Sequence, residues 1–361
     1  MIEIDGSYGE GGGQVLRTAL TLSVITGQAV HLRRIRAGRR NPGLQPQHLT
    51  GVLALAKVCA AELRGAGLKS TEIVFAPQSK PRVGEYKFDV AAVAQGGSAG
   101  SVILIAQTLL LPLAFAGGPS HLTLMGGTHV PWSPSFHYLA HVYLPMAVRM
   151  GLRAEAKLEA WGFYPVGGGR VRMEVTPPPS EGFPTGEGPG VGTLSLLARG
   201  SLKRVWGIGV AANLPAHIPQ RIASRARNVL AEGGVQAEIT PLRERAAGPG
   251  AGLFLVAEYE HTFAGFSSIG EKGKPSEQVA EEAALDLLAH YRSGEPVDMH
   301  LADQLLLPMA LARGRSEFRT CRVTQHLLTN AHIIQQFLPV RIEIEGEEHD
   351  AGRVVVNPSP V

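Results

Sequence analysis

Glu10 is the first residue whose surroundings suggest chemistry, because it lies in a segment, residues 6–13, that contains five glycines. Glycine lets the backbone adopt positive φ and lets a ligand approach the main-chain amides closely. An apolar, helix-like run over residues 16–25 follows, and the free N–H groups at a helix N-terminus favour anions. A carboxylate inside an anion-binding loop is useful mainly when Mg2+ or Mn2+ bridges it to phosphate oxygens. The sequence therefore predicts a phosphate and metal site at this loop.

Two familiar phosphate-binding templates do not fit the loop. Gly6 and Gly11 have the spacing of a Walker loop, but glycines stand where its Lys and its Ser or Thr belong. The dinucleotide-binding fingerprint also fails, because larger residues occupy the position of its third glycine. A tight turn between a strand and a helix, with no ligand, remains the alternative interpretation.

A second group of candidate residues is basic, since five arginines fall within residues 33–40. Gly and Pro residues hold this segment in a turn, so several guanidinium groups can face phosphates together. Gln47 and His48 then open a helix, predicted to extend to about residue 63, and can reach the same surface. The alternative is a solvated charged edge, which is the usual fate of charge runs.

A third group lies near the C-terminal end of the sequence. Residues 300–304 precede an apolar run, and His326 opens a predicted helix after a predicted strand over residues 317–323. A histidine can act as a nucleophile or a base near neutral pH. On the sequence alone, any one of the 13 histidines is more often a satisfied polar or surface group than a catalyst.

One motif points to a different chemistry. Residues 96–100 match G-x-S-x-G, the nucleophile elbow of α/β-hydrolases, between a predicted strand over residues 87–94 and an apolar helix over residues 101–114. No oxyanion motif precedes the match, and a hydrolase leaves the glycine loop and the arginines without a role. The glycines of this motif are more simply a turn or a ligand contact.

Another glycine-containing connection, residues 126–134, includes Pro131 and Trp132. Either side chain could stack on a base. Core packing is the commoner role of a tryptophan, so the sequence leaves both interpretations open at Trp132.

The composition excludes several classes of protein. Hydrophobic residues make up 44% and charged residues 18%, which is typical of a folded globular chain, and the net charge of +3 permits nucleic-acid binding without demanding it. Two cysteines exclude a disulfide framework or a zinc site of several cysteines, and indicate a reducing compartment. No secretory signal is recognisable, and the most apolar run, residues 102–116, is interrupted and too short to cross a membrane. We expect a cytoplasmic protein without membrane contact.

The elements that must position these residues form an α/β protein. Its 361 residues predict two domains, or one large domain with an insert. A strand, a glycine cluster and an apolar helix succeed one another at the start and again over residues 87–114, which indicates a duplicated unit. Residues 176–192 are dense in Pro and Gly and are typical of a linker. We therefore predict a large catalytic domain of residues 1–180 and 269–361, and a small inserted α/β domain of residues 181–268.

Four separated motifs carry a resemblance to a known family. They are Asp-Gly-Ser-Tyr-Gly-Glu-Gly-Gly-Gly-Gln-x-Leu-Arg at residues 5–17, Arg-Ala-Gly-Arg-x-x-Pro-Gly-Leu-x-x-Gln-His at 36–48, Leu-Ala-Asp-Gln-Leu-x-x-Pro-x-Ala-Leu-Ala at 301–312, and His-Leu-Leu-Thr-Asn at 326–330. Gly-Phe-Tyr-Pro-x-Gly-Gly-Gly at 162–169 is a fifth. In this order and nearly from end to end, the chain resembles the RNA 3'-terminal phosphate cyclase family.

The resemblance implies an ATP-dependent, nucleotidyl-transferring ligase of RNA processing. In that family a histidine takes AMP from ATP and passes it to an RNA 3'-phosphate, and the neighbouring 2'-OH then closes a 2',3'-cyclic phosphate with release of AMP. His326 matches the nucleophile. A neutral imidazole is nucleophilic near pH 7 and its phosphoramidate is a reactive AMP donor. The chain also lacks the Lys-x-Asp-Gly motif of lysine-dependent ligases.

The remaining site residues follow from the resemblance. It implies nucleotide contacts at Glu10, Gln14, Arg17, Gln107, Pro131, His300, Leu301, Ala302, Asp303 and Gln304. It implies Mg2+ or Mn2+ at Glu10 and Asp303, and RNA contacts at Arg39, Arg40, Gln47 and His48. One departure is His300, which stands where bacterial relatives carry a tyrosine against the adenine, so we expect weaker stacking there.

The implied fold is a large domain of three repeated units, each a four-stranded sheet with two helices on one face, interrupted by the insert. The same broad fold class includes enolpyruvyl transferases, so fold does not settle function. Two alternatives therefore stay open: a non-catalytic cyclase-like RNA-binding protein of ribosome assembly, which should lack the nucleophilic histidine, and an enolpyruvyl transferase that binds phosphate with the same arginines. A homodimer is compatible with the sequence.

Overall fold

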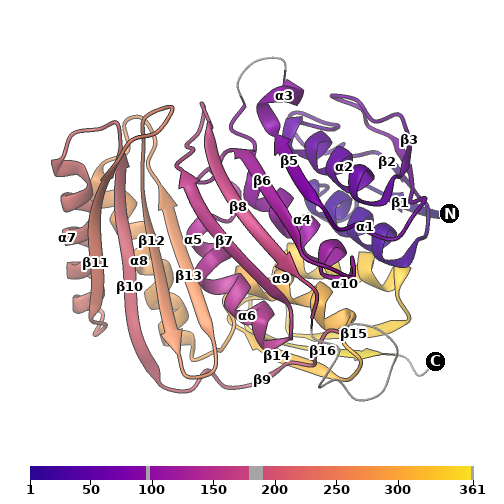
Figure 1. Cartoon of the computed structure of the whole chain (residues 1–361). Helices are drawn as coiled ribbons and strands as arrows, with labels where there is room; N and C mark the ends of the chain where they lie inside the picture. Colours follow the sequence, from indigo (N-terminus) through magenta and orange to yellow (C-terminus); the bar gives the residue numbers. More distant parts are fainter. Residues whose placement is uncertain (95–97, 179–189, 359–361) are drawn as a thin grey trace.

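Three four-stranded sheets with one common strand order organise the chain in the computed structural model, which describes residues 1–94, 98–178 and 190–358. In each sheet the first two strands are parallel neighbours, and the last two form an antiparallel hairpin that pairs with the second strand. Figure 1 shows the first sheet in indigo, the second in purple to magenta, and the third in orange to yellow apart from the rose strand β9. The predicted α/β fold of three repeated units is confirmed.

The first unit follows the order strand, helix, strand, helix and hairpin. Its elements are β1 (Ile2–Asp5), α1 (Gly13–Thr26), β2 (Val30–Arg33), α2 (Pro46–Cys59), β3 (Glu62–Arg64) and β4 (Ile73–Ala76). The sequence predicts that this helix extends to about residue 63, but α2 ends at Cys59, because Ala60 adopts a left-handed conformation with φ of 51°. The residues that follow pair with β4 instead.

The second unit repeats this order. It consists of β5 (Glu85–Asp89), α3 (Val90–Ala94), α4 (Val102–Ala114), β6 (Ser120–Gly126), the short helix α5 (Phe136–Tyr138), the wider turn η1 (Leu139–Tyr143), α6 (Leu144–Arg149), β7 (Arg153–Ala160) and β8 (Gly169–Thr176). The prediction of a strand over residues 87–94 is wrong in its second half, because α3 begins at Val90. The glycines at 96 and 97 of the G-x-S-x-G match lie outside the described residues.

The third unit is interrupted by a fourth sheet. Its own elements are β9 (Ser195–Leu196), α9 (Met299–Ala310), β14 (Ser316–Thr320), α10 (Gln325–Phe337), β15 (Val340–Glu345) and β16 (Gly352–Pro358). Between β9 and α9 lie β10 (Leu202–Ala212), α7 (His217–Glu232), β11 (Ala237–Glu244), β12 (Gly250–Tyr259), β13 (Phe263–Ile269) and α8 (Ser276–Ser293). These form a sheet of order β11-β10-β12-β13 that α7 and α8 cover.

The strand pairing bears on where the insert begins and ends. β9 pairs with β14 of the third unit, whereas α8 packs against α7, β12 and β13. By packing, the interrupting segment therefore runs from β10 to α8. The division at residues 181 and 268 stays a prediction, and most of the predicted linker, including residue 181, lies outside the described residues.

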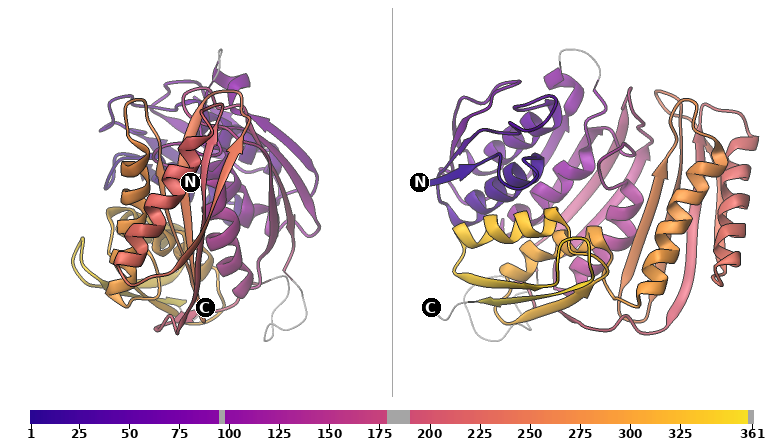
Figure 2. Two further views of the ribbon diagram at one scale, coloured as in Figure 1. Left: turned by 90° about the vertical axis from the view of Figure 1, so that its left-hand side faces the viewer. Right: turned by 180° about the vertical axis from the view of Figure 1, so that it is seen from behind.

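The helices of the three units meet in the interior. α1 contacts α2, α4 and α10, and α10 also contacts α9, so elements distant in sequence share one core. In the right-hand view of Figure 2, seen from behind, the helices of the second unit and of the insert lie in front of their sheets. In the part of the chain described here, no helix is both long enough and apolar enough to span a membrane.

Candidate active site

The glycine loop between β1 and α1 is shaped by backbone conformations that side chains disfavour. Gly9 and Gly11 have φ of 59° and 55°. A Cβ on Gly9 would overlap the hydroxyl of Thr329 on α10, so the loop lies directly against that helix. Tyr8 stacks on His332 of α10 with ring centroids 3.9 Å apart. These contacts explain why two distant motifs, 5–17 and 326–330, come together.

The N-terminus of α1 is available to an anion. Its N-cap is Gly12, which supplies no side-chain hydrogen bond, and the first turn holds no acidic residue. The first N–H groups of the helix therefore have no carboxylate competing for them, and the helix dipole adds to their attraction for phosphate.

His326 meets this loop from the first turn of α10. The hydroxyl of Thr324 caps that helix by accepting from the amide of Leu327 at 3.2 Å. His326 Nε2 lies 3.4 Å from Glu10 Oε2, and Arg39 Nη2 donates to the same oxygen at 3.0 Å. The predicted nucleophile, the loop carboxylate and one predicted phosphate-binding arginine thus form one cluster.

The environment of His326 favours its neutral form. Burial lowers the pKa of the ring, and the positive charges of Arg17, His300 and Arg39 lower it further, while Glu10 alone opposes them. Nδ1 is buried without a hydrogen-bond partner among the described residues, whereas Nε2 faces the loop. A neutral imidazole has a free lone pair, so Nε2 is the atom suited to attack an electrophile.

A partly buried chain of polar side chains links α1 and α9. Gln14 Nε2 donates to Asp303 Oδ2 at 3.2 Å, and Arg17 Nη2 donates to Gln14 Oε1 at 2.8 Å. Burial raises the pKa of Asp303 to about 7, against the opposing charge of Arg17, and burial lowers the pKa of Arg17 to about 10. A strongly shifted carboxyl pKa of this kind is typical of functional sites.

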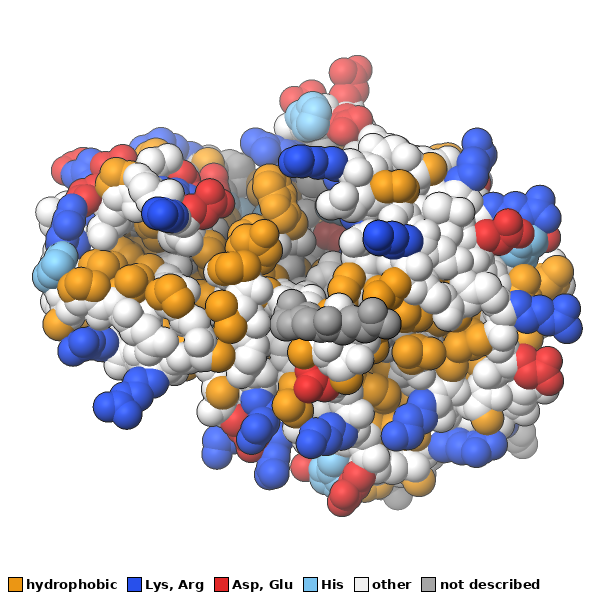
Figure 3. Space-filling model, turned by 90° about the horizontal axis from the view of Figure 1, so that it is seen from above, with side chains coloured by type: hydrophobic (Ala, Val, Ile, Leu, Met, Phe, Trp, Pro, Cys, Tyr) orange, Lys and Arg blue, Asp and Glu red, His pale blue; other side chains and the backbone are white. Residues whose placement is uncertain are grey.

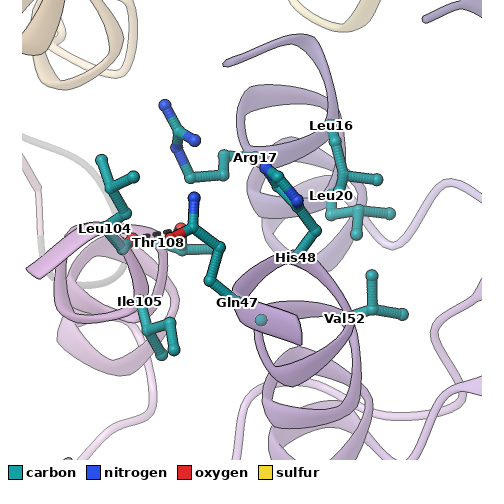
Figure 4. A pocket seen from close by; sticks show the side chains of 10 residues that line it. Leu16, Arg17, Leu20, Gln47, His48, Val52, Leu104, Ile105 and Thr108 are labelled. Atoms are coloured by element: carbon teal, nitrogen blue, oxygen red, sulfur yellow. Dashed lines mark hydrogen bonds between the residues drawn. The ribbon is translucent and has the colours of Figure 1, made fainter. Parts of the chain in front are cut away.

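A small pocket, open to solvent, lies beside Arg17 between α1, α2 and α4. Figure 4 shows Arg17, Gln47 and His48 around it, with apolar side chains from the three helices forming the remaining wall. Gln47 Oε1 accepts from the amide of Ser101 at 2.7 Å. His48 is buried, its Nδ1 accepts from the amide of Gln45 at 3.3 Å, and burial lowers the pKa of its ring to about 3.

Gln47 and His48 thus stabilise the local structure, in addition to any contact with a ligand. Gln47 ties α2 to the start of α4, and His48 completes the cap of α2. Their predicted contact with RNA stays a prediction. Arg39 and Arg40 are exposed on the loop after β2, where a phosphate can reach them.

Some of the residues predicted to contact the nucleotide touch one another in the structure, and others do not. Gln107 Nε2 donates to Gln304 Oε1 at 2.6 Å, so two of them pair across α4 and α9. The side chains of Leu301 and Ala302 are fully buried, which leaves only their backbone for a ligand. His300 is exposed, and its ring lies 6.3 Å from that of Tyr138. The ligand roles of all of these residues, and of Pro131, stay predictions.

The two predicted metal ligands do not form a preassembled site. Glu10 faces His326 and Arg39, whereas Asp303 bonds to Gln14. Within residues 1–94, 98–178 and 190–358, no group of three or more His, Cys, Asp or Glu is placed to hold an ion. A divalent cation would fit Glu10 only if phosphate oxygens of a bound nucleotide supplied other ligands, as is usual for Mg2+.

Two polar residues that the sequence analysis did not single out connect these helices. Asn330 Nδ2 donates to the carbonyl of Asp303 at 2.9 Å, and its Oδ1 accepts from the hydroxyl of Thr18 at 2.6 Å. Asn330 therefore joins α10, α9 and α1. Asn330 ends a quoted motif, but nothing in that motif indicates a partner 312 positions away.

Asp298 was also missed. It is 1% exposed, caps α9 by accepting from the amides of His300 and Leu301, and accepts from the hydroxyl of Tyr138. It also accepts from the amide of Gly265 in the insert at 3.3 Å. An Asp just before a predicted helix is an N-cap signal that could have identified the first role.

Comparison with known proteins places this geometry in a family. The family described as RNA 3'-terminal phosphate cyclase matches residues 8–344. A protein named RNA 3'-terminal phosphate cyclase from Trichormus variabilis is 53% identical over 93% of this chain and 94% of its own length. One of the same name from Methylococcus capsulatus is 50% identical over 100% of this chain and 97% of its own length. A solved structure of the enolpyruvyl transferase NikO from Streptomyces tendae covers 52% of this chain and 33% of its own at 16% identity and a TM-score of 0.28, which is too low to support an argument.

Proposed function

Because this chain belongs to the RNA 3'-terminal phosphate cyclase family, we propose that it uses ATP to convert an RNA 3'-terminal phosphate into a 2',3'-cyclic phosphate, through a histidyl-AMP and an RNA-adenylate intermediate. The observation that carries the proposed mechanism is the placement of His326 Nε2 at the glycine loop, 3.4 Å from Glu10 Oε2. The non-catalytic alternative requires no nucleophile at this position. An enolpyruvyl transferase requires no histidyl adduct.

In the first step, the lone pair of His326 Nε2 attacks the α-phosphorus of ATP. A P–N bond forms, the bond from the α-phosphorus to the oxygen that bridges it to the β-phosphorus breaks, and pyrophosphate leaves with that electron pair. The free N–H groups at the start of α1, together with Arg17 and Arg39, stabilise the charge on the phosphates. Mg2+ or Mn2+, held by Glu10 and by phosphate oxygens, would supply further charge neutralisation.

In the second step, an oxygen of the RNA 3'-phosphate attacks the phosphorus of the adenylyl group, and the P–N bond breaks to return neutral His326. In the third, the adjacent 2'-oxygen attacks the RNA phosphorus, AMP leaves with the bridging oxygen, and the hydroxyl proton passes to the AMP phosphate or to solvent. Arg39 and Arg40 bind the RNA phosphate in both steps, with Gln47 and His48 at the pocket behind them.

The overall reaction gives the direct test. We expect the purified protein, ATP and Mg2+ or Mn2+ to convert an oligoribonucleotide 3'-phosphate into a product that phosphatase no longer dephosphorylates, with one AMP and one pyrophosphate per cycle. A matched RNA with a 3'-hydroxyl should remain unchanged. Tight RNA binding with no ATP-dependent product under either metal would support the non-catalytic alternative instead.

Glu10→Gln should change the pH dependence of the first step in a defined direction. The Glu10 carboxylate raises the pKa of His326, so its removal lowers that pKa and keeps the imidazole neutral to lower pH. In single-turnover adenylylation, we expect the acidic limb of the rate profile to move to lower pH, while the maximal rate falls through loss of the metal ligand.

Glu3→Gln is the matched control for that variant, because Glu3 also lies beside a histidine, His31, but in the first sheet at 2.9 Å from Nδ1. It should leave the adenylylation profile in place. An acidic limb that moves to higher pH in Glu10→Gln would contradict the assignment of His326 as the titrating group.

The remaining parts of the proposal follow from the same assignment. ATP and Mg2+ or Mn2+ are the proposed cofactors, and RNA that ends in a 3'-phosphate is the proposed partner. The cytoplasm remains the proposed location, because a content of two cysteines is typical of a reducing compartment. A homodimer remains a prediction.

A further inference from the structure

Trp132 has an unusual combination of exposure and backbone conformation. Its side chain is 99% exposed, and its φ of 63° lies in the left-handed region that bulky residues avoid. Core packing, the commoner role of a tryptophan, is therefore wrong for this residue. Strained conformations persist where the surroundings impose them, and they concentrate at functional positions.

The loop that carries Trp132 is fixed by hydrogen bonds on both sides. The hydroxyl of Ser133 lies 2.5 Å from that of Ser101, the residue that caps α4. The amide of Phe136 donates to the carbonyl of Thr128 at 3.0 Å. The indole is thus presented to solvent by an ordered backbone, which lowers the entropy lost when it binds a partner.

A second exposed ring lies on the neighbouring connection. Tyr164, between β7 and β8, is 65% exposed. Thr128 and His129 both donate through their amides to the carbonyl of Gly162, so the two connections leave the fold side by side. Phe163, only 1% exposed, anchors the second connection in a cluster shared with the insert.

The connection that carries Trp132 adjoins the pocket at Arg17. Ser101, which bonds to Ser133, donates through its amide to Gln47 Oε1 at 2.7 Å, and Gln47 lines the pocket with Arg17. A route therefore runs from the phosphate-binding side chains, over the start of α4, to Trp132. Figure 3 looks onto the face where β7 ends and β8 begins, and shows it hollowed between the insert and the rest of the molecule, with hydrophobic side chains along the hollow.

One exposed arginine lies next to the connection that carries Tyr164. Arg245 is exposed and precedes Ala246, whose backbone pairs with Trp161 at the base of the connection that carries Tyr164. Single-stranded nucleic acids are held by stacking of bases on aromatic rings together with a positively charged path for the backbone. Stacking needs no base-edge hydrogen bonds, so it accepts many sequences.

We propose that Trp132 and Tyr164 form a stacking surface for the bases of single-stranded RNA that precede the terminal phosphate. This inference rests on the proposed function, because it assumes that the 3'-phosphate is bound at Arg39 and Arg40. The rings then bind the upstream nucleotides of the same strand, and they determine how much chain the protein requires beyond the reacting end.

The test compares a long and a short substrate. Trp132→Asn removes the ring and keeps a residue that tolerates positive φ, whereas Trp132→Phe keeps a ring. We expect Trp132→Asn, and separately Tyr164→Leu, to weaken binding of an oligoribonucleotide 3'-phosphate by between about five-fold and a hundred-fold, as loss of one stacked base predicts. Trp132→Phe should retain most of the affinity. A dinucleotide 3'-phosphate, too short to reach the rings, should bind all variants alike.

Leu285→Asn is the matched control, since Leu285 is another exposed apolar side chain, 54% exposed, on α8 of the insert. It should not change either affinity. An equal loss for the long and the short substrate would overturn the proposal, because the ring would then act on the reacting end or on ATP. Unchanged affinity of the oligonucleotide in Trp132→Asn would overturn it as well.

Labelling of the protein from ATP without RNA separates this inference from the proposed function. Trp132→Asn should take up AMP as the wild-type protein does, because neither ring is part of the first step. If the wild-type protein takes up no AMP, the proposed function fails, yet the length-dependent binding can still be measured. If labelling is normal and length dependence is absent, only the stacking surface is disproved.

Discussion

His326→Ala should abolish the transfer of label from ATP, labelled at the α-phosphate, to the denatured protein. No other group in the cluster supplies a lone pair with the same access to the glycine loop, since Glu10 is engaged by Arg39 and Asp303 is buried against Gln14. Removal of a nucleophile usually costs several orders of magnitude, so we expect at least about a thousand-fold loss of both adenylylation and cyclisation.

The adduct should be labile to acid and stable to alkali, as a phosphoramidate is, because protonation of the imidazole makes it a good leaving group. His121→Ala is the matched control: this histidine is exposed on β6 and lies 3.7 Å from Glu174, another His–Glu pair outside the cluster. A different result would be that His326→Ala is labelled as strongly as the wild-type protein while another histidine variant loses the label. The chain would then still be adenylylated, but that other histidine would be the nucleophile.

The local backbone structure of the site could be predicted from the sequence, because adjacent residues determine it. Glycines at residues 9 and 11 take the positive φ that their loop requires, and Thr324 before His326 is an ordinary helix cap. Each signal depends on a few adjacent residues. The strand and helix periods of the three units are local in the same way, which is why the fold class could be given from the sequence.

What could not be predicted depends on contacts between distant segments. Nothing near His48 indicates that its imidazole is buried with a pKa lowered to about 3, because that burial comes from packing of α2 against the loop and Arg17. The pairing of β9 with β14, which lie on either side of the insert in the sequence, could not be predicted from the sequence either. A two-residue strand has no period to detect, so its place in the third sheet appears only when the tertiary structure is known.

The position of α8 could not be predicted either, because it also depends on contacts between distant segments. Its residues form a helix, but the partner of the buried face of a helix cannot be deduced from a single amphipathic pattern. Packing on α7 and β13 assigns it to the interrupting segment. The segment ends with α8, and Asp298 lies just beyond it, where its carboxylate accepts from the amide of Gly265 in the insert and from the amide of His300 at the start of α9.

Asp298→Ala should therefore be the most damaging substitution outside the reaction itself. It leaves the hydroxyl of Tyr138 and the amides of Gly265, His300 and Leu301 without their acceptor in a region that is almost fully buried. Loss of a cap costs about 1 kcal/mol, and each buried donor left unsatisfied costs about 1–3 kcal/mol. We expect the free energy of unfolding, measured by urea denaturation, to fall by about 4 kcal/mol.

Tyr138→Phe provides the internal comparison, since it removes only one of these donors and should cost about 1 kcal/mol. In the double variant, the loss of unfolding free energy should be smaller than the sum of the two single losses. Tyr138→Phe removes the hydroxyl that Asp298→Ala would leave without an acceptor. Full additivity would show that the two groups do not interact.

A second readout distinguishes local positioning from general stability. Asp298 fixes the start of α9, and its charge also raises the pKa of Asp303, so its loss should lower that pKa while it loosens the segment that carries His300. At temperatures where Asp298→Ala is still folded, we expect weaker ATP binding and slower labelling of His326, with binding of the RNA 3'-phosphate nearly unchanged. Asp298→Asn keeps an oxygen for the helix cap and should recover much of the ATP affinity. Equal weakening of ATP and RNA binding in Asp298→Ala would instead mean that the whole site depends on this junction, and that α9 has no separate role in positioning the nucleotide.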